Sequence, residues 1–169
     1  MTVAAMSAIL ALAVLVASPE APEGPPRVGD RVPDFALFDT EDRLISSAAM
    51  AEPVLVLNFW GFWCDTWVKE LGQLRELALL QEGLGFRLLA ISVDGRWTDE
   101  LGLVCGEGGL PFPVLLDTHG TLRGPLGIRR VPTVLVLDRE RRIRYVHEAY
   151  PGNAEVLKAI RRAASRPPL

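Results

Sequence analysis

Residues 60–67 read Trp-Gly-Phe-Trp-Cys-Asp-Thr-Trp and join two segments with different hydrophobic patterns. The segment before them, 54–60, is a nearly continuous apolar run, typical of a strand that is buried on both faces. After them, from about Cys64 to Leu80, apolar residues recur every three or four positions. This spacing predicts a helix with one buried face that includes Val68. The sequence therefore predicts a strand that leads into a helix through a loop carrying Cys64.

Cys64 is a candidate nucleophile because of this position. A helix N-terminus presents unpaired backbone N–H groups and the positive end of the helix dipole, and both favour a thiolate. Asp65 opposes the effect, since a neighbouring carboxylate favours the neutral thiol. The alternative is that Cys64 is a small buried apolar residue, with Asp65 and Thr66 as ordinary residues of a helix start.

The rest of the chain alternates between predicted strands and helices, without internal repeats. Further strands are expected at residues 34–39, 87–94, 113–117, 134–138 and 143–148. Helices are expected from about residue 98 to the glycines at 106–109, as a short turn at 122–128, and at 153–164. This order predicts an α/β fold, a central sheet with helices on both faces. The last two strands are joined by a tight turn and must pair antiparallel, so the sheet is mixed.

A longer pattern around the cysteine resembles a known family. The pattern is Asn58-Phe59-Trp60-x-x-Trp63-Cys64-x-x-Trp67-x-x-Glu70. It is similar to the active-site segment of the TlpA/ResA-like thiol–disulfide oxidoreductases, extracytoplasmic members of the thioredoxin superfamily with a redoxin/AhpC-TSA-like domain. A second pattern, Gly127-Ile128-x-x-Val131-Pro132-Thr133, resembles the cis-proline segment of that family. The resemblance runs from about residue 28 to residue 163.

The resemblance implies a thioredoxin fold in which the cysteine loop faces the cis-proline loop. Cys64 would be the catalytic nucleophile. An incoming extended peptide would pair with the backbone beside the cis bond. The residues that this implies for substrate binding are Trp63, Asp65, Thr66, Trp67, Val131, Pro132 and Thr133. The substrate would be a protein or small molecule with a thiol or disulfide, a membrane redox donor is a candidate partner, and no cofactor is implied. For the aromatic residues, core packing is the alternative role.

The sequence departs from the family at Trp67, which stands where the second cysteine of a Cys-x-x-Cys motif is expected. In a dithiol cycle the first thiolate forms a mixed disulfide with the substrate, and the second thiol then releases the substrate. The attack of the second thiol on the mixed disulfide is fast because an intramolecular group acts at a high effective concentration. An indole cannot attack sulfur. The sequence therefore predicts that Cys64 works as a monothiol and that an external thiol completes the cycle.

Cys105 is the other cysteine, 41 positions after Cys64. A right-handed crossover is expected to place its helix on the opposite face of the sheet. Seven helical residues beyond Thr98 would set it roughly 10 Å from the active-site edge. A disulfide needs Cα atoms within about 7 Å. We therefore expect Cys105 to be a buried core residue and not the resolving thiol.

Two other function classes stay open. A catalytically silent binding module would use the aromatic residues around Trp67 to hold a partner. A peroxiredoxin-like antioxidant enzyme is disfavoured, because its threonine, proline and arginine are missing: Gly61, Leu57 and Pro132 stand at or near their positions. A thiolate can nevertheless be oxidised slowly to a sulfenic acid.

The N-terminus predicts export from the cytoplasm. Residues 3–17 are apolar apart from Ser7, a length that fits a signal peptide better than a full membrane span. We expect a signal peptide or anchor at 1–18, a Pro-rich linker at 19–27 and a thioredoxin-like domain at 28–166. The protein would then be periplasmic or secreted, or held at the membrane by residues 3–17.

Composition adds little about partners. The formal net charge is −3, and 49% of the residues are hydrophobic, enough to bury a core. Residues 28–122 carry 6 basic and 15 acidic side chains, whereas 123–169 carry 11 and 4. A basic half can contact an acidic partner or lipid, but a solvated Arg-rich hairpin and last helix is the favoured explanation. Nothing in the pattern suggests nucleic-acid binding, and two histidines and two distant cysteines give no metal site.

Overall fold

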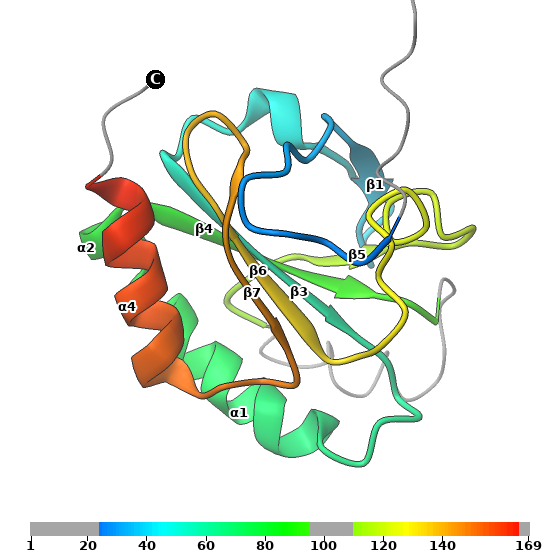
Figure 1. Ribbon diagram of the computed structural model, residues 1–169. Helices are drawn as coiled ribbons and strands as arrows, with labels where there is room; N and C mark the ends of the chain where they lie inside the picture. Colours follow the sequence, from blue (N-terminus) through cyan, green and yellow to red (C-terminus); the bar gives the residue numbers. More distant parts are fainter. Residues whose placement is uncertain (1–23, 95–109, 166–169) are drawn as a thin grey trace, which may run out of the picture.

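The computed structural model describes residues 24–94 and 110–165, which are organised around a five-stranded sheet (Figure 1). Its strand order is β5-β4-β3-β6-β7. The strands are β3 (Val54–Trp60), β4 (Phe86–Ser92), β5 (Val114–Leu116), β6 (Thr133–Leu137) and β7 (Ile143–Glu148). β3 is parallel to β4 and β4 to β5, whereas β6 is antiparallel to both β3 and β7. The predicted mixed sheet is confirmed.

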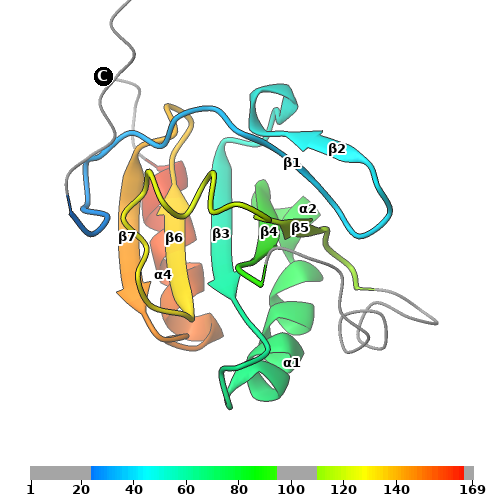
Figure 2. The same cartoon turned by 90° about the vertical axis from the view of Figure 1, so that its right-hand side faces the viewer.

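Strand β3 lies at the centre of the sheet, and all seven of its residues are buried. Its side chains alternate between the two faces. On one face they pack against α1 (Trp67–Ala78) and α4 (Asn153–Ala164), which contribute Leu74 and Ile160 to the same core cluster. Figure 2 shows α4 behind β6 and β7, on the side of the sheet that α1 also covers. The cysteine loop follows the C-terminal end of β3, so it lies at the edge of the sheet where α1 begins.

Among the described residues, the second face is covered by segments that contain no α-helix. A hairpin of β1 (Ala36–Phe38) and β2 (Leu44–Ser46), followed by the 3-10 helix η1 (Ser47–Ala49), lies over it. The loop between β5 and β6 runs across the same face (Figure 2). It adds Leu122 and Leu126 to this core. The helix expected from about residue 98, with Cys105, lies outside the described residues. No helix within 24–94 and 110–165 has the length and apolarity needed to cross a membrane.

The helix after the cysteine differs from its prediction. It was expected from about Cys64 to Leu80, but α1 begins at Trp67 and ends at Ala78, and a separate short helix, α2 (Gln81–Leu84), follows. Val68 was expected on the buried face, but it is 63% exposed. The reason is that the buried stripe of α1 begins one turn later, at Glu70 and Leu71. The strand expected at 34–39 is only three residues long, and its partner β2 was not predicted.

Gly127 shows why the loop before the proline needs a glycine. Its φ is +64°, a conformation that side chains disfavour. A Cβ at this position would lie 1.8 Å from the carbonyl oxygen of Gly24, so the N-terminal segment packs directly on the Gly127 backbone. Further along this N-terminal segment, the N–H of Gly29 donates to the carbonyl of Ile143 at the start of β7, and the N–H of Ile143 donates to the carbonyl of Asp30. The N-terminal segment therefore braces the loop that leads to Pro132.

We expect Gly127→Ala to destabilise the fold more than Gly120→Ala. Both glycines have a φ of +64°, so both variants carry the left-handed backbone cost of about 1–2 kcal/mol. At Gly120 the nearest atom to a Cβ is Nε of the flexible Arg123 side chain at 3.3 Å. At Gly127 the nearest atom is backbone. Urea unfolding should give a loss at least about 1 kcal/mol larger for Gly127→Ala, and equal losses would show that the Gly24 contact contributes nothing.

Candidate active site

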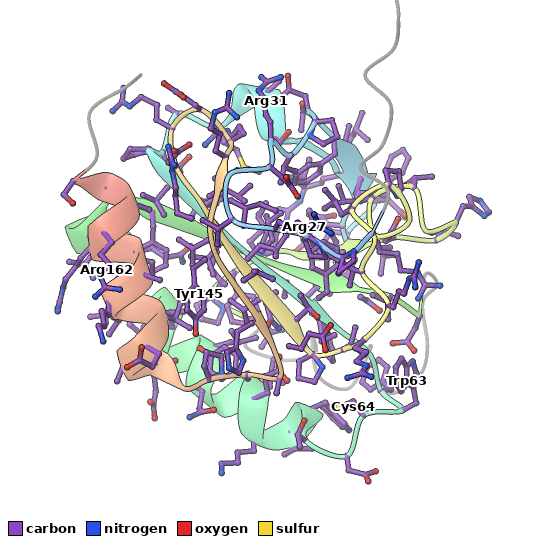
Figure 3. The ribbon with its side chains drawn as sticks, in the orientation of Figure 1. Arg27, Arg31, Trp63, Cys64, Tyr145 and Arg162 are labelled. Carbon is purple, nitrogen blue, oxygen red and sulfur yellow. The ribbon has the colours of Figure 1, made fainter. Side chains whose placement is uncertain are left out.

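Cys64 lies in the turn between β3 and α1, at the lower edge of the molecule in Figure 3. Its backbone N–H donates to Gly61 O (3.2 Å), and its carbonyl accepts from Trp67 N (3.1 Å). The cysteine was expected on the first turn of the helix. It lies three residues before the first helical residue, because two consecutive turns intervene. These turns leave the side chain half-buried, with its sulfur turned toward the loop before β6.

Two groups contact the sulfur. The Sγ atom lies 3.2 Å from the hydroxyl oxygen of Thr66, and the thiol donates to the carbonyl of Val131 over 3.8 Å. The Val131–Pro132 peptide bond is cis. The cysteine turn and the loop before β6, which are far apart in sequence, therefore meet at the sulfur through Thr66 and Val131. An extended chain that paired with the backbone of Val131 would pass directly beside Cys64.

The other predicted site residues divide by exposure. Trp63, Asp65 and Thr66 are exposed, Trp63 by 64% of its surface. Trp63 stands over Gly61, where a Cβ would lie only 2.8 Å from the indole Nε1. Thr133 is buried instead, and its hydroxyl donates to Arg130 O (2.7 Å). The hydroxyl of Thr133 thus holds the proline loop from inside the protein.

Trp67 is packed into an aromatic cluster. Its ring centroid lies 5.1 Å from that of Phe62 and 6.3 Å from that of Trp60, and Trp60 and Phe62 are themselves 5.1 Å apart in an edge-on arrangement. Such pairs stabilise a structure beyond the area that they bury. The position expected to hold a resolving thiol is therefore occupied by a ring that stabilises the start of α1.

A buried polar pair lies beneath the site. Glu70, one turn along α1, is only 3% exposed. It accepts a hydrogen bond from Asn58 Nδ2 at 2.7 Å. Burial raises the pKa of the Glu70 carboxyl to about 7, and the Asn58 hydrogen bond only partly offsets this. The pKa of Tyr150 is raised as well, by burial and by the nearby charges of Glu70 and Glu76. Glu70 can therefore change its protonation state near neutral pH.

Glu70 also lines a pocket of about 300 Å³ next to the cysteine. One wall comes from α1 and the turn before it, and the other from the proline loop and the connection between β7 and α4. The lining residues are Thr66, Lys69, Glu70, Gln73, Pro132, Ala149, Tyr150, Pro151 and Gly152. Cys64 is not among them, but Thr66 and the Val131–Pro132 unit join it to the pocket.

Sequence reasoning gave no role to Asn58, Glu70, Lys69 or Tyr150. A signal for the first two was present, since Asn58 is the one polar residue in the apolar run 54–60 and a polar side chain in a buried strand requires a partner. Glu70 appeared in the family pattern without a function. Nothing in the sequence indicated that residues 149–152 would approach α1.

Comparisons with known proteins identify the family and agree with the fold. Residues 28–146 match the AhpC/TSA family. The chain is 28% identical over 119 residues to the thiol-disulfide oxidoreductase ResA of Geobacillus thermodenitrificans, which covers 70% of this chain and 68% of the relative. Among solved structures, it is similar to a putative thiol:disulfide interchange protein DsbE from Chlorobium tepidum, with a TM-score of 0.69 and 23% identity over 82% of this chain and 97% of the other. The peroxidoxin BcpB from Mycobacterium tuberculosis also gives a TM-score of 0.69, with 23% identity over 83% and 99%.

Proposed function

Because the chain belongs to the AhpC/TSA family and is a ResA/TlpA-like protein of the thioredoxin superfamily, we propose that it exchanges thiols and disulfides through Cys64 alone. One observation carries the proposal. The half-buried Cys64 sulfur faces the carbonyl of Val131 beside a cis-proline, whereas the position of a resolving thiol is filled by Trp67. The substrate is a protein thiol or disulfide, presented as an extended segment along Val131.

The first step needs only groups at the site. The Cys64 thiolate attacks one sulfur of the substrate disulfide, a Cys64–substrate disulfide forms, and the other substrate sulfur leaves as a thiolate that takes a proton from water. Trp63 and Val68, both more than half exposed, provide an apolar rim for the flanking residues of the substrate. An external thiolate then attacks the mixed disulfide and releases the substrate.

We also propose that the domain works outside the cytoplasm. The apolar residues 3–17 support this, and so does the similarity to an exposed lipoprotein thioredoxin from Streptococcus pneumoniae, at a TM-score of 0.67 and 22% identity. An extracytoplasmic compartment holds protein disulfides on which the exchange can act.

The test compares the natural protein with Cys64→Ser and Cys105→Ser. Each is incubated with a protein disulfide such as insulin, with and without 2-mercaptoethanol, and sampled by mass spectrometry after acid quenching. We expect a mixed disulfide at Cys64 without the small thiol, and turnover once it is added. Cys64→Ser should abolish both, and Cys105→Ser should change neither. Efficient turnover that needs no small thiol and is lost in Cys105→Ser would make Cys105 the resolving thiol.

A binding module is the second candidate, favoured by the Trp60–Phe62–Trp67 cluster, which fixes the cysteine loop without a second thiol. It predicts that Cys64→Ser binds the same partner as the natural protein and that neither exchanges disulfides.

A further inference from the structure

The C-terminal ends of β3 and β4 lie side by side at the edge of the sheet that carries the cysteine loop. The two strands are parallel, and their last residues, Trp60 and Ser92, are register partners. Beyond the strands the N–H of Val93 donates to the carbonyl of Trp60 at 2.8 Å, so the two segments stay together as they leave the sheet. The next residue, Asp94, therefore lies beside the start of the loop that leads to Cys64.

The Asp94 carboxylate bonds to the backbone of this loop. Its Oδ2 atom accepts from the N–H of Phe62 at 3.1 Å and from the hydroxyl of Ser92 at 3.2 Å. The Ser92 hydroxyl in turn accepts from the Asp94 N–H at 3.3 Å, and Ser92 is fully buried in β4. Hydrogen bonds to a carboxylate are stronger than those between neutral groups. The carboxylate is thus fixed to the sheet on one side and to the cysteine loop on the other.

The other backbone hydrogen bonds of this loop run within the loop itself or to the first turn of α1. Among the residues that the structure describes, Asp94 alone bonds from outside 61–70 to the backbone of residues 61–66. The Cys64 sulfur nevertheless has to stay within reach of the Val131 carbonyl, 3.8 Å away on a separate loop. The bond to Asp94 therefore fixes the point from which the turn with the sulfur starts.

We propose that Asp94 is a positioning residue, which holds the Cys64 sulfur opposite the proline loop through the N–H of Phe62. The inference rests on the proposed function, because it concerns the attack of this sulfur on a disulfide presented along Val131. Such an attack requires aligned reacting atoms, and a displacement of about 1 Å can slow a reaction about a hundredfold. The two contacts of the sulfur that the structure describes are with Thr66 and Val131, so Asp94 acts through the loop and not on the sulfur itself.

The experiment measures how fast the reduced protein forms a Cys64–insulin disulfide in a single turnover, by acid quenching and mass spectrometry, with Cys105→Ser as the parent protein. Asp94→Ala should slow this reaction about tenfold, because the loop is no longer tied to β4. Asp94→Asn keeps an oxygen that can accept from Phe62 and should restore the rate to within about twofold of the parent. Ser92→Ala releases one side of the carboxylate and should slow the reaction about threefold, which tests the proposal even where Asp94→Ala does not fold.

Asp30→Ala is the matched control. Asp30 is half-buried, as Asp94 is, and its Oδ2 atom also accepts a backbone N–H, that of Arg27, at 2.9 Å. Figure 3 shows Arg27 well away from Cys64. Asp30→Ala should therefore lose a comparable hydrogen bond, measured by urea unfolding, and leave the rate of Cys64–insulin disulfide formation unchanged. Equal slowing in Asp30→Ala and Asp94→Ala would make the effect one of general stability and overturn the positioning role.

Alkylation by iodoacetamide separates the position of the sulfur from its reactivity. This small reagent needs only an accessible thiolate, so all variants should be alkylated at Cys64 at the parent rate across the pH range. A changed pH profile in both Asp94→Asn and Asp94→Ala would show that Asp94 acts through its charge, and it would overturn the positioning role. An insulin reaction as fast in Asp94→Ala as in the parent would overturn it as well. A parent protein that forms no Cys64–insulin disulfide would instead overturn the proposed function.

Discussion

Trp67→Cys is expected to let the pre-reduced protein release a reduced substrate without any added thiol. Position 67 is the first residue of α1, and its N–H already donates to the carbonyl of Cys64 across a single turn. A thiol there would be held next to the mixed disulfide, and well-oriented intramolecular groups reach effective molarities of about 10⁵ M or more. We expect single-turnover release of substrate thiols at least about a hundredfold faster than in the natural protein.

The variant also has a structural cost. It removes the ring contacts of Trp67 with Phe62 and Trp60. Truncation of a fully buried tryptophan costs about 3–5 kcal/mol, and the cost here should be smaller because Trp67 is only half-buried. Thermal unfolding must therefore be measured alongside the exchange assay.

The matched control is Trp67→Ser, which leaves nearly the same cavity without a thiol. All variants are made in a Cys105→Ser background and mixed with insulin after reduction and desalting. Mass spectrometry should find Trp67→Cys two hydrogens lighter, with a disulfide between residues 64 and 67, and should find Trp67→Ser and the natural residue as mixed disulfides. A folded Trp67→Cys protein that forms no internal disulfide would show that the site has diverged at more than this residue and would favour the binding module.

The sheet could be predicted because its strands carry strong local patterns. The apolar run 54–60 and the β6–β7 hairpin around residues 139–142 fix both the central strand and the mixed order. Of the short hairpin β1–β2, only β1 was predicted, within residues 34–39. The three residues of β2 carry too short a pattern to be recognised, and they form a strand by pairing with β1 over the second core. The start of α1 was also placed too early, because local apolar spacing does not distinguish Val68, which is exposed, from Leu71, which is buried.

The sequence predicted only the parts of the site that lie in the cysteine motif and the proline motif. Cys64 and Val131 were expected to meet on the evidence of a family pattern, and their atoms lie in contact. The pocket depends on residues 149–152, which the sheet and α4 bring to α1 although no spacing in the sequence relates them. The burial of Glu70 likewise follows from tertiary packing, because a glutamate on a helix is ordinarily exposed.

That burial makes Glu70→Gln the second variant with a large expected effect, in this case on stability. The pKa of the Glu70 carboxyl is about 7 in the folded protein, against an ordinary value of 4.5. Between these two values the folded state binds more protons than the unfolded state, so the free energy of unfolding falls as the pH rises from about 4.5 to about 7. Above this window the folded protein carries a buried charge that costs about 3 kcal/mol.

Glutamine keeps the oxygen that accepts from Asn58 Nδ2 and cannot ionise, so Glu70→Gln imitates the protonated protein at every pH. Urea unfolding at pH 4.5 should give nearly equal stabilities for the variant and the natural protein. At pH 8 the variant should be more stable by up to about 3 kcal/mol. Glu82→Gln, an exposed substitution on α2, is the control and should follow the natural protein at both values. If Glu70→Gln instead follows the natural protein at both pH values, the Glu70 carboxylate is solvated in the folded state and its pKa is not shifted from the ordinary value of 4.5.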